Sequence, residues 1–328
     1  MFGPVIRSGG PSAAPGLPIP RVDFRPDASY FTSPKKPFGP EALDLAVGPI
    51  RMRLQGLSGR QTTVLRSRFR PFIPEDGADP VVTIRLSRAA VEGFLRLRDD
   101  RAPEIYRMES RLCGGRLTLW SYEFAGWLEA AGGAAGLDLV QEEGTLFDRG
   151  LENFLRVLSA SFVLHEGGFL LHGSGVVRGG KAYIFFGPSG AGKTTVTRLS
   201  PRDTVLSDDL TLVVRREGGT YAAAGIPFGL AHHQVPETSA AFPIASLNRL
   251  VQSSSVRRDR LSTAQAVADV AASLPFVMQE TRQATLAMAT VGEALETIPV
   301  YRLEFREDDS FWKVVEEQRG EGVPVAGC

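Results

Sequence analysis

Apolar and polar positions alternate through much of residues 41–147. The run 50–54 interleaves apolar residues with arginines, and the runs 81–86 and 117–122 carry a similar period of two. This alternation is typical of strands that pack one face on a core and turn the other to solvent. Glycines and prolines separate the runs. We therefore predict a strand-rich N-terminal domain over 41–147, and we assign no catalytic cluster to it.

Two stretches near the start of the chain lack this period. Residues 1–40 contain nine prolines and five glycines, a composition that cannot bury enough apolar surface to offset the entropy of ordering. We expect a flexible segment there. The stretch Leu57-Ser-Gly-Arg-Gln61 predicts a hairpin turn.

From Asp148 the apolar spacing becomes helical. We predict a helix with Asp148 as its N-cap that continues to about His165, and an ATP-binding kinase domain from 148 to 328. The apolar positions of that helix are Leu151, Phe154, Leu155, Leu158 and Phe162.

Further extended runs follow this helix. The runs 168–172 and 175–177 lead through Gly179-Gly180 into the run 182–186, and a Gly-Gly pair between apolar runs predicts a tight hairpin. An antiparallel hairpin at this point departs from the usual βαβ order. Later elements are predicted as strands at 204–206, 210–214 and 300–305, a helix from the Ser262 and Gln265 capping box to about 274, a helix at 283–295, and a short helix from about 309.

The composition narrows the class of protein. The 328 residues are 43% hydrophobic and 23% charged with zero net charge, so nothing indicates nucleic acid or a membrane as partner. Two cysteines make no disulfide framework, and no apolar stretch approaches the length that spans a membrane. We expect a cytoplasmic protein that could form a homo-oligomer.

The strongest chemical signal is a glycine-rich loop at 187–195. The sequence Gly-Pro-Ser-Gly-Ala-Gly-Lys-Thr-Thr follows a predicted strand, precedes a predicted helix, and fits the phosphate-binding pattern G-x-x-x-x-G-K-[ST]. Its backbone amides can converge on phosphate oxygens, its lysine can neutralise the β- and γ-phosphates, and the next hydroxyl can bind Mg²⁺. The expected ATP-binding residues are Gly187, Pro188, Ser189, Gly190, Ala191, Gly192, Lys193, Thr194 and Thr195.

Two adjacent carboxylates follow this loop. Asp208 and Asp209 come fifteen and sixteen residues after Lys193, which is enough chain for one helix, a turn and a short strand. Phosphoryl transfer needs one carboxylate to hold Mg²⁺ and often another to accept the proton of the attacking hydroxyl. We expect Thr194 and Asp208 as metal ligands and Asp209 as the base.

Two other features leave a choice open. His172 ends an apolar run, and its spacing fits a core residue as well as a catalytic one. Arg257, Arg258 and Arg260 precede the capped helix and are interpreted as a solvated basic turn, with contact to phosphate or acceptor as the alternative.

Three blocks together resemble the catalytic core of the HPr kinase/phosphorylase family: His172-Gly173, the loop 187–194, and Ser207-Asp-Asp209. The resemblance implies a phosphoenolpyruvate-carboxykinase-like P-loop fold with a mixed sheet, and active-site roles for His172 and Lys193. It also implies Asp209 as the base toward a serine and Thr194 as a Mg²⁺ ligand. The stretch 220–228 lacks the glutamate and the arginine-glycine loop of that family, so the chain looks closer to its divergent relatives, some similar to kinases that modify ribosomal peptides.

The predicted function is transfer of the γ-phosphate of ATP to a hydroxyl, on a serine of a protein or peptide. One alternative is a nucleotide-gated binding module without kinase activity, and another is a small-molecule hydroxyl kinase. Protein and small-molecule acceptors fit the same residues, as do ATP, another triphosphate and pyrophosphate as donors.

Overall fold

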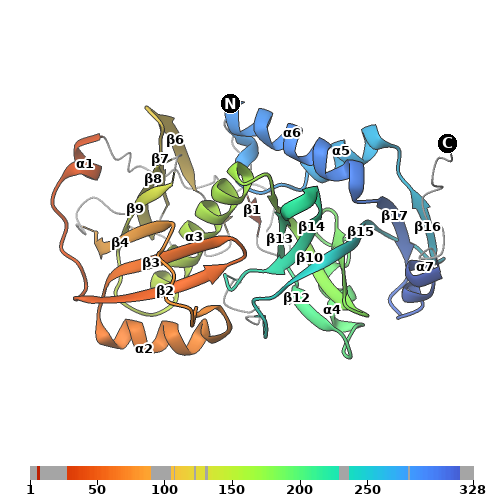
Figure 1. Cartoon of the computed structure of the whole chain (residues 1–328), viewed down its shortest axis with the longest axis horizontal. Helices are drawn as coiled ribbons and strands as arrows, with labels where there is room; N and C mark the ends of the chain where they lie inside the picture. The colour runs from red at the N-terminus through yellow and green to blue at the C-terminus, as the bar shows by residue number, and fades with distance from the viewer. Residues whose placement is uncertain are drawn as a thin grey trace.

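Two mixed β-sheets flank a long helix, α3 (Thr145–His165), in the computed structural model (Figure 1). The α/β class and the strand-rich N-terminal region are confirmed. The structure describes residues 6–7, 28–89, 105–106, 108–121, 123–129, 132–228, 236–279 and 281–317.

Most of the segment predicted to be flexible, residues 1–40, lies outside the described residues. Within it, β1 (Ile6–Arg7) pairs with β5 (Ile105–Tyr106), and α1 (Ala28–Thr32) is helical. Tyr30 and Phe31 of α1 pack against a small apolar cluster at one face of the first sheet.

The first sheet has seven strands in the order β2-β3-β4-β9-β8-β7-β6. Strands β3, β4 and β9 are parallel and their other neighbours are antiparallel. The strands are β2 (Glu41–Val47), β3 (Ile50–Leu57), β4 (Val82–Arg88), β6 (Glu109–Cys113), β7 (Arg116–Trp120), β8 (Phe124–Glu129) and β9 (Gly133–Leu139).

The hairpin turn predicted at 57–61 is wrong. A helix, α2 (Gly59–Arg68), begins there and is followed by the 3-10 turn η1 (Arg70–Phe72). The Ser58 hydroxyl accepts a hydrogen bond from the Gln61 N–H, and the Gln61 side chain accepts one from the Ser58 N–H. This capping box starts the helix that the parallel crossover from β3 to β4 requires.

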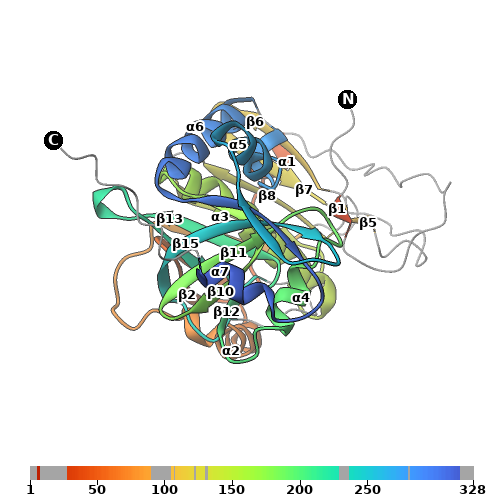
Figure 2. The ribbon, with the colours of Figure 1, turned by 90° about the vertical axis from the view of Figure 1, so that its right-hand side faces the viewer.

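The second sheet follows the path β11-β10-β13-β14-β15-β17-β16, with β12 paired to β10. Because β15 also pairs with β11, the strands β10, β13, β14, β15 and β11 close a ring (Figure 2). The strands are β10 (Phe169–Arg178), β11 (Lys181–Phe186), β12 (Thr204–Ser207), β13 (Leu210–Arg215), β14 (Tyr221–Gly225), β15 (Ala241–Gln252), β16 (Arg257–Arg260) and β17 (Val300–Phe305). The predicted strands at 204–206, 210–214 and 300–305 are confirmed.

Helix α3 joins the two sheets into one core. It is buried along most of its length, and one apolar cluster includes Leu45 of the first sheet, Phe154 of α3 and Leu212 of the second. The helix begins at Thr145 with Gly144 as N-cap, so the prediction of Asp148 as cap is wrong; Asp148 lies in the first turn.

The remaining helices surround the second sheet, with α5 and α6 side by side along its upper side in Figure 1. The helices predicted from Ser262 and over 283–295 are confirmed, and the last begins two residues later than predicted. None of the described helices is both long and apolar enough to cross a bilayer. The elements are α4 (Lys193–Arg198), η2 (Glu217–Gly219), α5 (Thr263–Ala271), η3 (Val277–Gln279), α6 (Thr281–Thr297) and α7 (Phe311–Glu317).

Candidate phosphate-loop site

The glycine-rich loop leaves a tight hairpin. Strands β10 and β11 pair in antiparallel fashion, and Gly179 and Gly180 between them have φ of 58° and 72°. Both values are left-handed, as the favoured two-residue hairpin turn requires. Strand β11 ends at Phe186, and the loop runs directly from it into α4. The predicted hairpin is confirmed.

Gly192, the last glycine of the loop, occupies a position with no room for a side chain. Gly192 has φ of 107°, and a Cβ there would lie 2.5 Å from the ring of Phe305. Its backbone conformation and the close ring both favour glycine. The loop therefore turns into α4 against a fixed aromatic surface.

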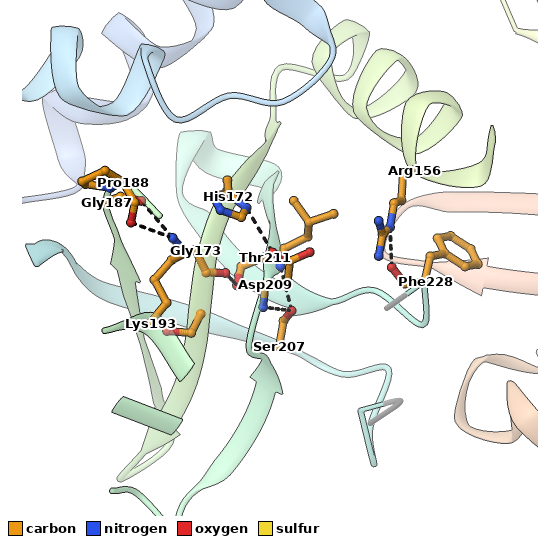
Figure 3. Close-up of polar contacts among 12 residues, drawn as sticks. Arg156, His172, Gly173, Gly187, Pro188, Lys193, Ser207, Asp209, Thr211 and Phe228 are labelled. Carbon is orange, nitrogen blue, oxygen red and sulfur yellow. Dashed lines mark hydrogen bonds and ion pairs between the residues drawn. The ribbon is translucent and has the colours of Figure 1, made fainter. Parts of the chain in front are cut away.

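Lys193 is the first residue of α4, and its side chain turns back to the loop. Lys193 is 9% exposed. Its ammonium donates hydrogen bonds to the carbonyl oxygens of Gly187 and Pro188 at 2.9 and 3.2 Å (Figure 3). Burial lowers the pKa of this lysine, while the charge of Asp209 acts in the opposite direction. The ammonium is thus positioned by the loop and coupled to a carboxylate outside it.

The aspartate pair lies where β10 changes its neighbour. His172 of β10 faces Leu210 of β13, and Gly175 faces Ser207 of β12. Asp208 and Asp209 form the turn between these two strands. The Ser207 hydroxyl accepts hydrogen bonds from the N–H groups of Asp209 and Leu210 at 3.2 and 2.9 Å, which stabilises the turn from within.

This switch of neighbours brings His172 and Asp209 together. The His172 Nδ1 lies 3.2 Å from Asp209 Oδ1, with side chains 40% and 21% exposed (Figure 3). The His172 N–H donates to the Ser273 carbonyl at 2.9 Å, and Thr211 donates its hydroxyl to the Gly173 carbonyl at 2.8 Å. These bonds anchor the backbone at His172 to the turn after α5 and tie β13 to β10, and the pair remains partly exposed to solvent.

The other predicted ligands lie at the same edge of the sheet. Thr194 is exposed at the first turn of α4, and Asp208 is half-buried in the turn between β12 and β13. Their hydroxyl and carboxylate oxygens are hard donors of the type Mg²⁺ takes. Within the described part of the chain, no group of three or more His, Cys, Asp or Glu side chains could hold a metal ion.

Two residues at the loop were missed by the sequence analysis. Gln252, the last residue of β15, donates from Nε2 to the Gly190 carbonyl at 2.7 Å, and Phe305, the last residue of β17, underlies Gly192. Both residues reach the loop because of the register of two parallel strands. Register between distant strands cannot be recognised from the neighbouring residues in the sequence.

The arginines at 257–260 are not a solvated turn but strand β16. Arg258 is buried and donates to Asn248, to Ser246 and to the Val315 carbonyl. Its guanidinium lies 3.6 Å from the centre of the Tyr301 ring, and burial lowers its pKa to about 10. Arg258 therefore packs within the protein interior, while Arg257 and Arg260 are exposed.

The chain is thus an α/β protein whose glycine-rich loop, carboxylate pair and histidine converge at one sheet edge. Residues 154–318, just over half of the chain, match the family described as SynChlorMet cassette protein ScmC. The chain belongs to this ScmC family. No curated protein matches it.

The assignment by resemblance to HPr kinase/phosphorylase is wrong, because the matching family is ScmC. The three blocks behind that resemblance are short and all belong to the site. Short site motifs of this kind can recur without common family membership.

Proposed function

We propose that this protein is an ATP- and Mg²⁺-dependent kinase that transfers the γ-phosphate to a hydroxyl of a protein or peptide serine. The observation that carries the proposal is the contact of Asp209 with His172, at a turn whose charge also acts on the buried lysine of the glycine-rich loop. A carboxylate, an imidazole and an ammonium at one edge are the groups that phosphoryl transfer to a hydroxyl uses.

Each residue has a stated task. Asp209 accepts the proton of the acceptor hydroxyl while that oxygen bonds to the γ-phosphorus and the bond to the β-phosphate oxygen breaks, giving ADP. His172 holds the Asp209 carboxylate in place from the neighbouring strand, and Lys193 neutralises charge on the transferred group. Thr194 and Asp208 would hold Mg²⁺, which supplies neutralisation of the β- and γ-oxygens.

The same features support a finer fold proposal. An antiparallel hairpin feeds the loop, and the surrounding sheet is mixed and partly closed. We propose that the second sheet has a phosphoenolpyruvate-carboxykinase-like arrangement, to be tested by superposition of an experimental structure on members of that fold.

The test is labelled γ-phosphate transfer by wild type and Asp209→Asn. The variant keeps the size of the side chain but cannot take the proton, so transfer should fall by roughly 10²–10⁴-fold while ATP binding persists. Asp259→Asn, on β16 beside an exposed arginine, is the matched control and should transfer normally. The family is named for a cassette, so products of adjoining genes are the first acceptors to assay. Equal transfer by Asp209→Asn would remove Asp209 from the mechanism.

A nucleotide-gated module is the second candidate, favoured by one contact of the helix between the two sheets. Arg156 of α3 donates from Nε to the Phe228 carbonyl just beyond β14 at 2.6 Å, so this helix is tied to the segment that follows the strand beside β13. This candidate predicts that the wild type transfers no phosphate, which the same assay detects. It also predicts ATP-dependent binding of a partner.

A further inference from the structure

Three parallel strands end together at the loop. Strand β11 is parallel to β15, and β15 is parallel to β17. The glycine-rich loop follows β11, and the last residues of the other two strands, Gln252 and Phe305, face each other in register. The carboxyl ends of parallel strands are a common place for ligands in α/β folds. The turns that follow β15 and β17 therefore belong to the surroundings of any ligand on the loop.

The loop has two unlike sides. On the β15 and β17 side, Gln252 bonds to the Gly190 carbonyl, the Phe305 ring underlies Gly192, and a Cβ at Gly187 would lie 3.4 Å from the Leu250 carbonyl oxygen. On the other side of β11, strand β10 presents His172 next to Asp209. The residues proposed to carry out phosphoryl transfer therefore lie on the β10 side of the loop only.

The turns on the opposite side form one polar rim. The Ser253 N–H donates to the Phe305 carbonyl at 3.0 Å and ties the two turns together. The hydroxyls of Ser253 and Ser255 lie 3.1 Å apart, and the Asp308 carboxylate accepts from the Ser310 N–H at 3.0 Å. We call Gln252, Ser253, Ser255 and Asp308 the polar rim. Its amide, hydroxyl and carboxylate groups match the hydroxyl groups of a sugar.

We propose that the polar rim is a nucleoside subsite that binds the ribose of the phosphoryl donor. The inference rests on the proposed function, because a triphosphate whose γ-phosphate faces Asp209 must extend across the loop and leave it on the β15 and β17 side. A carboxylate that accepts from ribose hydroxyls is a recurrent solution in nucleotide-binding α/β folds. Hydrogen bonding to Ser310 and Arg306 lowers the pKa of Asp308, which keeps that acceptor ionised.

The experiment compares ATP with inorganic triphosphate, which has the phosphates but no nucleoside. Calorimetry with Mg²⁺ on the full chain measures both affinities, and the readout is their ratio, because effects on the loop itself cancel in it. Gln252→Leu and Asp308→Asn should each lower the ratio about 3- to 10-fold, the effect of one lost hydrogen bond. Gln265→Leu is the matched control, since this exposed glutamine on α5 bonds to Asp269 of its own helix, and its ratio should not change.

Each result decides the proposal. A wild type that binds ATP no more tightly than triphosphate, or variants that weaken both ligands equally, would overturn the subsite. A wild type that prefers ATP, loses that preference in both variants, and still transfers no phosphate would support the subsite and overturn the proposed kinase.

Discussion

Two clusters of charge in this protein contain similar side chains but differ in access to solvent. At the loop, His172 and Asp209 are 40% and 21% exposed, whereas at the junction of the two sheets the side chain of Glu152 is 4% exposed beside Arg68. In the first cluster, His172 lies on strand β10 and Asp209 in the turn before β13. The second cluster joins side chains of the two helices α2 and α3. Access separates a cluster that can meet a substrate from one that holds the fold together.

The buried cluster, which consists of Arg68, Glu152 and Arg156, links several elements. Arg68 of α2 forms an ion pair with Glu152 of α3, and Arg156 holds both the Asn153 side chain and the Phe228 carbonyl. Burial raises the pKa of Glu152 to about 7, although Arg68 and Arg156 oppose the shift. We infer a structural role for it, which the following changes test against the loop cluster.

The largest expected effect is on stability, from Arg156→Met. Methionine keeps an apolar stem of similar shape but removes the cation near buried Glu152 and the donor to Phe228. Breaking a buried charge cluster costs about 3–5 kcal/mol of the free energy of unfolding, which urea unfolding followed by circular dichroism measures. Arg257→Met, at an exposed ion pair, should change stability by less than about 1 kcal/mol. Equal small losses in both variants would contradict the structural role.

Lys193→Ala, in the loop cluster, should reduce activity and leave stability nearly unchanged. Loss of the loop cation should reduce phosphoryl transfer by roughly 10²–10³-fold, the effect of removing one charge-stabilising donor, and should weaken ATP binding. The melting temperature should stay close to that of wild type. Lys181→Ala, at the exposed start of β11, is the control. Calorimetry that finds wild-type ATP affinity and turnover in Lys193→Ala would contradict the assignment of the loop.

Local features around the two clusters were visible in the sequence, but the long-range contacts that form the clusters were not. The glycine-rich loop, the Gly179-Gly180 hairpin and the helices near 262 and 283 were predicted because each signal lies within a few neighbouring residues. The contact of His172 with Asp209 depends on β10 changing from β13 to β12. The buried cluster joins α2, α3 and the residue Phe228. Sequence separation hides both.

The errors have equally physical causes. Helix α2 was missed although Ser58 and Gln61 form a capping box, because the intervening glycine and arginine favoured a turn. The cap of α3 was misplaced because Gly144 offers no side-chain signal and Asp148 is equally common in a first turn. The family was wrong because the resemblance rested on three short motifs of the candidate site, whereas the matching family covers residues 154–318.

The pH dependence of stability should separate the clusters further. A glutamate whose pKa is near 4.5 unfolded and about 7 folded binds its proton more tightly in the folded protein. Its protonation therefore favours folding at low pH, and stability falls as pH rises from about 4.5 to 7, by up to about 3 kcal/mol. Glu152→Gln cannot titrate, so the difference between wild type and variant should shift in favour of the variant across this window. Urea unfolding at several pH values measures that difference, and a constant difference would contradict the raised pKa.

The smallest effect concerns the packing beneath the loop, which belongs to a separate apolar cluster. Trp312 of α7 packs edge-on against Tyr183 and Phe185 of β11 and donates from Nε1 to the Ser200 hydroxyl, just beyond α4, at 3.0 Å. Trp312→Phe keeps an aromatic ring but loses that buried hydrogen bond, so the free energy of unfolding should fall by about 1–2 kcal/mol. Because Ser200 closes the segment that carries Lys193, ATP affinity should also weaken, whereas Arg156→Met should leave the affinity of the folded fraction near that of wild type. Urea unfolding and calorimetry on the two variants measure both quantities. If Trp312→Phe lowers stability and leaves ATP affinity unchanged, the aromatic cluster supports the sheet but does not position the loop.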